Sequence, residues 1–216
     1  GYAIPEVNRL MHAFMAGARE MNSDVTFLVN FLDSWYDPPK AKESAFAMID
    51  AGADVMYAER FGVADAAVER GKKAIGNVID TANDYPGTIL ASALWHMEAT
   101  IDKAIGAVAD GSYTADDYSQ YSFMAHNGGS LAIDKSLVPA NVVAAIAAKE
   151  AAIRDGSFVV TINDETPVSD NWSLGFLLLK IPSDDALHLT GFLYSPYLLA
   201  DSRYEQWHCA ISKPIE

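Results

Sequence analysis

Aromatic and acidic residues stand just after each of four predicted β-strands in the first half of the chain. Aromatic faces stack on flat rings, and carboxylates accept hydrogen bonds from the N–H groups of such rings. If the four strand ends share one edge of a sheet, these side chains form a pocket for a flat heteroaromatic ligand. The residues that follow the strands are Trp35, then Glu59 and Phe61, then Asp80, and finally Trp95.

The elements that must position these residues alternate between strands and helices. Short apolar runs predict the strands, and apolar residues at helical spacing predict the helices between them. Asp37 is a good N-cap, and Pro5 and Pro38 stand where first-turn prolines belong. The pattern predicts an α/β fold with a parallel sheet covered by helices on both faces, in which ligands bind outside the carboxyl ends of the strands. The predicted strands are 25–32, 54–58, 73–79 and 88–94, and the predicted helices are 4–21, 38–51, 62–71 and 95–109.

The alternation changes after residue 111, where aromatic and polar residues predict a crossover strand and a long loop. A helix at 139–155 and a strand at 157–164 follow. The composition shifts again near Asn171, and one hypothesis is that this tail is not the native end of the fold. The expected division is a ligand-binding α/β lobe at 1–111, a crossover, loop, helix and strand at 112–165, and an atypical tail at 166–216.

Composition excludes several classes of function. The 216 residues carry a formal net charge of −14, which repels phosphate backbones and disfavours nucleic-acid binding. Cys209 is the single cysteine, so the chain forms no intrachain disulfide. Phosphate-loop, zinc-protease, calcium-loop and Gly-x-Ser-x-Gly motifs are all absent from the sequence, so the catalytic signals are weak and we expect no metal and no cofactor.

Each candidate residue also has a purely structural interpretation. An aromatic side chain near a strand end is commonly a lid on the core. Asp37 fits a helix cap better than a ligand contact. Glu59 could pair with Arg60 or Lys40 at the surface, and Asp80 could cap a turn. Only the coincidence of four strand ends favours a pocket.

Five motifs, in this order along the chain, resemble the basic membrane protein family. They are IPEVNRLMHAFMAGARE, SWYDPPKAKESA, IDAGADVMYAERFGV, AIGNVIDT and ASALWHMEATIDKAI. The resemblance covers about residues 1–165. Members of this family are substrate-binding proteins of ABC importers for purine nucleosides and related purines. The resemblance implies a type I periplasmic-binding fold, whose two hinged α/β lobes close on a ligand, and it places this chain at the second lobe without the first.

The resemblance also implies ligand-binding roles at positions found from the strand ends. Trp35 would stack on the purine, Glu59 would receive hydrogen bonds from the base, and Asp80 and Trp95 would complete the wall. Nucleoside-binding relatives carry an aspartate for the ribose hydroxyls where this chain has Val78, which favours a free base such as adenine over a nucleoside. The full set of predicted ligand-binding residues is Trp35, Glu59, Asp80, Trp95, Phe61 and Asn77.

The expected function is a non-enzymatic, monomeric purine receptor, either periplasmic or lipid-anchored, that delivers its ligand to an ABC transporter permease. Its mechanism would be hinge closure. Two alternatives use the same fold. The effector-binding domain of a transcription regulator would need a DNA-binding helix-turn-helix, which the sequence lacks, and a nucleoside-processing enzyme would alter its purine chemically.

Overall fold

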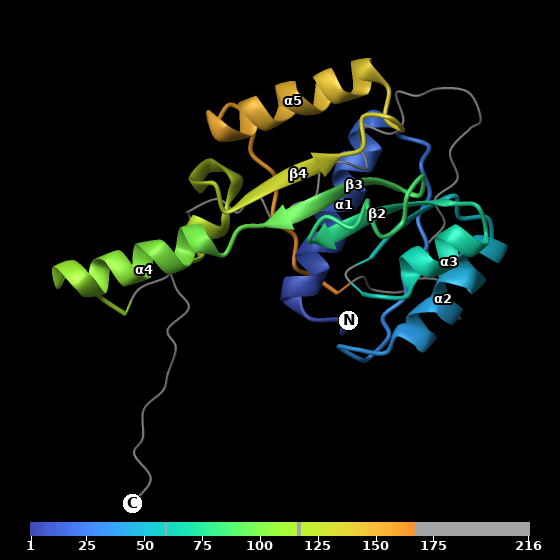
Figure 1. The fold of residues 1–216 in the computed structure, drawn as a ribbon, viewed down its shortest axis with the longest axis horizontal. Helices are drawn as coiled ribbons and strands as arrows, with labels where there is room; N and C mark the ends of the chain where they lie inside the picture. The colour runs from blue at the N-terminus through green and yellow to red at the C-terminus, as the bar shows by residue number, and fades with distance from the viewer. Residues whose placement is uncertain (59, 116–117, 167–216) are drawn as a thin grey trace, which may run out of the picture.

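The computed structural model describes residues 1–58, 60–115 and 118–166, and it confirms the α/β class. Four strands form one sheet in the order β1-β2-β3-β4, with helices on both faces (Figure 1). The strands are β1 (Val55–Tyr57), β2 (Lys73–Val78), β3 (Ile89–Trp95) and β4 (Gly129–Ile133). The helices are α1 (Pro5–Met21), α2 (Pro38–Asp50), α3 (Val63–Glu69), α4 (Glu98–Asp110) and α5 (Ala140–Arg154), with two 3₁₀ turns, η1 (Ser119–Ser122) and η2 (Met124–His126).

The first two helices begin where the local sequence predicts. Pro5 opens α1, where the missing N–H has no intrahelical partner to lose. Asp37 caps α2, because its carboxylate Oδ1 accepts the backbone N–H of Lys40 at 3.1 Å. The prediction of Asp37 as a helix cap is therefore confirmed.

Strand directions place three strand ends at one edge of the sheet. β1, β2 and β3 are mutually parallel, so their carboxyl ends meet. The predicted parallel sheet is therefore confirmed for these three strands, and β4 is the exception, because it is antiparallel to β3. The reason is topological, since the chain leaves the sheet after β3 through α4, η1 and η2 and returns directly beside β3 in the opposite direction.

Two cores hold the helices on the sheet. On one face, Phe14 of α1 and Ile146 of α5 pack with Ile75 of β2. On the other face, Ile49 of α2 and Ala66 of α3 pack with Met56, Ala74 and Ile89. Apolar residues thus line both faces of β1 and β2, as expected for parallel strands buried between helices.

Two predicted strands are wrong for the described residues. Residues 25–32 are extended but join no ladder, and their contacts include an N–H of Leu32 that donates to the carbonyl oxygen of Gly1 at 3.1 Å. Residues 157–164 also join no ladder. The end of this segment instead lies against α1, where the amide of Asn8 donates to the carbonyl oxygen of Asp164 at 3.2 Å. Extended apolar sequence is therefore not sufficient for a ladder, which needs a neighbour in register.

Helix α4 is the least buried helix of the described part of the chain. Its single buried residue is Ala107. The apolar face predicted from the sequence is present, but Ile101, Ile105 and Val108 are all exposed. No helix in the part of the chain that the structure describes is long and apolar enough to cross a membrane.

Candidate functional site

The turn after residues 25–32 projects Trp35 at the edge where the parallel strands end. Asp33 adopts a left-handed backbone with φ of 51°, a conformation that aspartate tolerates better than most residues. The hydroxyl of Ser34 then accepts the backbone N–H of Tyr36 at 3.3 Å. This turn leaves 52% of Trp35 exposed, so its ring is not a buried lid on the core.

Trp35 lies between residues of two other segments. The ring of Tyr2 lies 5.1 Å away between centroids and is tilted by 56°. The guanidinium carbon of Arg60 lies 4.9 Å from the centroid of the Trp35 ring, within the range of a cation–π contact. The turn at residues 33–37 and the loop after β1 therefore meet at this edge.

Phe61 belongs to the same group of residues. Its ring is 60% exposed, and its centroid lies 6.4 Å from that of Tyr36, with the two rings edge to face. The structure thus brings together the two segments that carry the predicted site residues Trp35 and Phe61. Glu59, the predicted acceptor for the base, lies outside the described residues.

Gly62 fixes the loop after β1 against α2. Its φ of 102° is a left-handed conformation, and a Cβ at this position would lie 2.3 Å from the carbonyl oxygen of Pro38. Only glycine permits both features. The close approach holds Arg60 and Phe61 beside the turn that carries Trp35.

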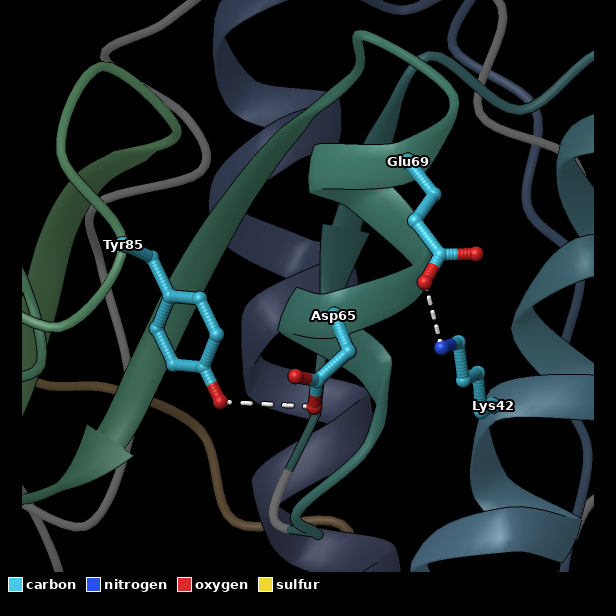
Figure 2. Close-up of polar contacts among 4 residues, drawn as sticks. All are labelled: Lys42, Asp65, Glu69 and Tyr85. Atoms are coloured by element: carbon cyan, nitrogen blue, oxygen red, sulfur yellow. Dashed lines mark hydrogen bonds and ion pairs between the residues drawn. The ribbon is translucent and has the colours of Figure 1, made fainter.

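Side-chain contacts hold α3, which begins directly after this loop. Figure 2 shows the ammonium of Lys42 on α2 donating to the carboxylate of Glu69 on α3 at 2.6 Å. It also shows the hydroxyl of Tyr85, from the loop between β2 and β3, donating to the carboxylate of Asp65 at 3.3 Å. Burial, followed by the adjacent Asp65 carboxylate, raises the pKa of Tyr85, so the phenol stays protonated at neutral pH. Helix α3 thus joins two loops, because it begins at the end of the loop after β1 and binds Tyr85 of the loop after β2.

The end of β2 carries Asn77 and a strained residue. Both polar atoms of the Asn77 amide are buried, and neither has a hydrogen-bond partner among the described residues. Val78 follows with a φ of 74°, which is unfavourable for a β-branched side chain by roughly 1–3 kcal/mol. Such strain is concentrated at functional sites, and here it adjoins a buried amide that lacks a partner among the described residues.

Asn77 and Trp95 face the same side of the sheet. Asn77 pairs with Ala93, and Trp95 lies two residues beyond Ala93 on the same strand. Because side chains alternate along a strand and paired residues share a face, both point toward the side covered by α1 and α5. Trp95 is half-buried at the end of β3, beside Gly129 of β4.

Asp80 turns toward the opposite face of the sheet. Its Oδ1 accepts the backbone N–H of Ala82 at 3.0 Å and the hydroxyl of the buried Ser92 at 3.5 Å. Gly76 makes room for this arrangement, since a Cβ there would lie 2.6 Å from the Ser92 hydroxyl oxygen. The turn-capping interpretation of Asp80 therefore has direct geometric support, whereas its contact with a ligand stays a prediction.

Arg60 and Ser92 are the residues that sequence reasoning missed. Arg60 follows a predicted strand directly, so its place at the edge could have been read from the same pattern that selected Phe61. Ser92 sits inside an apolar strand, and nothing in the sequence indicates that its hydroxyl meets Asp80. Within the described ranges, no group of three or more metal-ligating side chains exists.

Comparison with known proteins shows the family to which the chain belongs. Residues 1–129 match the family described as PnrA-like ABC transporter substrate-binding proteins. A purine-binding protein of Brucella abortus is 33% identical over 112 residues, which cover 51% of this chain and 32% of that protein. A Haloferax volcanii protein named as the glucose-binding protein of an ABC transporter is 33% identical over 119 residues, covering 54% and 30%. The chain thus spans about a third of the length of these relatives.

A solved structure supports the fold alone. The chain is similar to a transcriptional activator of the comK gene from Bacillus halodurans, with a TM-score of 0.52 and 24% identity. The similarity covers 60% of this chain and 47% of that one.

Proposed function

The chain belongs to the family of PnrA-like ABC transporter substrate-binding proteins, and we propose that it binds a purine base at the edge formed by the carboxyl ends of its parallel strands. One observation carries the proposal. Trp35 holds a large ring that is 52% exposed at this edge, where such a ring serves stacking better than packing. A purine offers the flat surface that matches it.

The amide of Asn77 supports a ligand with polar groups on its edge. A buried polar group without a partner costs about 1–3 kcal/mol, so the two buried amide atoms favour a guest that supplies both a donor and an acceptor. A purine base has both on its rim. Glu59 is proposed to accept from an N–H of the base, and Asp80 and Trp95 are proposed to complete the wall.

Val78 favours a base over a nucleoside. A valine side chain accepts no hydrogen bond from ribose hydroxyls, whereas the aspartate implied at this position in nucleoside-binding relatives does. The left-handed backbone at residue 78 is also less strained for aspartate than for valine. The valine therefore has a cost in strain and contributes no polar contact to a sugar.

The proposed receptor is non-enzymatic and acts outside the cytoplasm, in the periplasm or on a lipid anchor. Ligand that bridges two lobes makes its full contacts only in the closed state, so binding shifts the population toward closure. The closed receptor then delivers the purine to an ABC transporter permease. The name of the Brucella relative supports the purine ligand, and the name of the Haloferax relative makes glucose the natural competitor to test.

Titration calorimetry of the chain with adenine, adenosine and glucose tests the proposal. We expect adenine to bind most tightly, adenosine more weakly and glucose not at all. Binding of glucose in preference to adenine would overturn the ligand class. Chromatography of adenine and adenosine after prolonged incubation should return both unchanged, and loss of either would show an enzyme instead of a receptor.

A further inference from the structure

Trp95 is the last residue of β3, and the two elements next to it give this strand end little side-chain packing. The residue opposite Trp95 on β4 is Gly129, which has no side chain to pack against the ring. The chain then enters α4, whose single buried residue is Ala107. The backbone directly after Trp95 therefore needs another anchor if the ring is to keep one position.

His96, the next residue, makes two contacts with β4 and the turn before it. Its backbone N–H donates to the carbonyl oxygen of Gly128 at 2.9 Å. Its ring Nε2 lies 2.7 Å from the hydroxyl oxygen of Ser130, a hydrogen-bond distance. A hydroxyl can donate or accept, so both neutral tautomers of the ring can use this contact. His96 thus contacts the two residues that flank Gly129, the cross-strand neighbour of Trp95.

The contact with Ser130 places the His96 ring on the face of the sheet opposite to Trp95. Ser130 pairs with Leu94, and paired residues share a face. Trp95 follows Leu94 along the strand, so its side chain points to the other face. His96 therefore acts on Trp95 through the backbone that the two residues share, and its own ring does not form part of the pocket wall.

Helix α5 holds the turn to which His96 is bonded. The N–H of Gly128 donates to the carbonyl oxygen of Phe123 at 2.9 Å. The residue before it, Asn127, accepts the guanidinium Nη1 of Arg154 through its side-chain Oδ1 at 3.1 Å. Arg154 is the last residue of α5, which packs on the sheet. The contacts of His96 thus connect the end of β3 to a buried part of the fold.

We propose that His96 is a positioning residue for Trp95, and that the His96–Ser130 pair keeps the Trp95 ring in the orientation that completes the wall of the purine site. The consequence for binding rests on the proposed function, in which Trp95 contacts the ligand. A side chain held in its bound orientation binds more tightly, because less conformational freedom is lost on binding. Loss of the pair should weaken binding without removing an atom that contacts the purine.

Titration calorimetry with adenine tests the pair in the parent protein, His96→Ala, Ser130→Ala and the double variant. We expect each single variant to bind adenine about 3- to 10-fold more weakly, which is the size of one lost hydrogen bond. The double variant should lose no more than either single variant, because both substitutions remove the same contact. Ser130→Ala keeps the backbone contact of His96, so it provides the same test if His96→Ala does not fold.

Two further variants separate the hydrogen bond from the mere presence of an imidazole. His96→Gln should restore the affinity, since its amide group is as many bonds from Cα as the ring Nε2 and can also donate or accept. His126→Ala removes an exposed imidazole from the turn before β4 and should leave adenine binding unchanged. Urea denaturation of each variant checks that it is folded.

A measurement without ligand tests the position of the ring itself. Protein labelled with fluorotryptophan gives a fluorine NMR resonance for Trp95, which Trp95→Phe assigns. We expect His96→Ala to shift or broaden this resonance, His96→Gln to restore it, and the resonance of Trp35 to stay unchanged in both. A change confined to Trp95 is not expected from a general loss of stability.

The outcomes for His96 and for the purine site are distinguishable. A parent protein that does not bind adenine would overturn the proposed function, and the Trp95 resonance would then decide the positioning role alone. Equal adenine affinity in the parent protein and His96→Ala would overturn the positioning role. Additive losses in the double variant, or an unchanged Trp95 resonance in His96→Ala, would overturn it as well.

Discussion

Helices α4 and α5 both carry large apolar residues, yet only α5 buries several of them against the sheet. Val142 and Ile146 of α5 are fully buried against the sheet, and α5 lies along it (Figure 1). Helix α4 extends beyond the edge of the sheet in the same view, and Ile105 in its middle is 61% exposed. Helical periodicity therefore predicts a helix and its apolar face, but the surface that covers this face depends on segments elsewhere in the chain.

The two helices should also contribute to the free energy of unfolding in different ways. Residues of α5 and the sheet contribute through burial, and residues of α4 contribute mainly through helix propensity and the local contacts with η1. One such contact places the ammonium of Lys103 5.7 Å from the centroid of the Tyr121 ring. The change in the free energy of unfolding should therefore differ in size between substitutions in the two regions. For one pair of substitutions it should also differ in sign.

The largest effect is expected for an isoleucine pair. Ile146→Ala removes a side chain that is 0% exposed and leaves a cavity in the core, so the free energy of unfolding should fall by about 2–5 kcal/mol. Ile105→Ala on α4 is the matched control and should change it by less than about 0.5 kcal/mol. Urea denaturation measures both, and equal losses would show that α4 is buried in solution.

A glycine at the candidate site should give the next largest effect. Gly62→Ala forces a Cβ against the carbonyl oxygen of Pro38 and a left-handed backbone on alanine, so the free energy of unfolding should fall by about 1–3 kcal/mol. The displaced loop should also weaken the contact of Arg60 with Trp35, visible as a change in tryptophan fluorescence. A variant as stable as the parent protein, with the same spectrum, would refute the close approach.

A glycine on α4 should act in the opposite direction. Gly106 lies inside the helix with no atom within 4 Å of an added Cβ. Gly106→Ala should therefore raise the free energy of unfolding by about 0.5–1 kcal/mol. Gly111→Ala is the control in the same helix and should lower it, because Gly111 ends α4 with a φ of 77°. A gain from both substitutions would contradict the position of the helix end.

The smallest effect is expected at Tyr85, which ties the loop after β2 to α3. Tyr85→Phe removes a 3.3 Å hydrogen bond to Asp65 and should lower the free energy of unfolding at pH 7 by about 0.5 kcal/mol. The pKa of Tyr85 is raised in the folded protein, so its stabilising effect is complete below pH of about 10 and is lost as the pH rises through the raised value. The deficit of Tyr85→Phe should shrink above that pH, and a deficit that grows would contradict the direction of the shift.

Local signals made much of the fold predictable. Pro5 and the Asp37–Pro38 pair predicted the starts of α1 and α2, and apolar runs predicted β1, β2 and β3. The prediction of a strand at residues 25–32 is wrong because strand pairing depends on a second segment beside it. The sequence of one segment does not show whether such a partner is present. The antiparallel direction of β4 could not be predicted for a related reason, since it depends on how the chain returns from α4.

The sequence predicted which segments meet at the strand edge, whereas ligand binding at this edge stays a prediction. The turn that carries Trp35 meets the loop that carries Phe61, since Arg60 contacts Trp35 and Tyr36 contacts Phe61. The left-handed backbone of Val78 could not be predicted, because a β-branched residue is the poorest signal for that conformation. The contact of Asp80 with Ser92 joins residues of two strand segments, and only the fold brings them together.

Calorimetric titration of adenine into the parent protein, Trp35→Ala and Tyr113→Ala tests the central claim most directly. Trp35 and Tyr113 are each 52% exposed, but Tyr113 follows α4 and lies outside the candidate site. Loss of a stacking partner costs about 1–3 kcal/mol, so Trp35→Ala should weaken adenine binding about 5- to 150-fold while Tyr113→Ala leaves it unchanged. Equal affinities for all three proteins would contradict the assignment of this strand edge as the purine site.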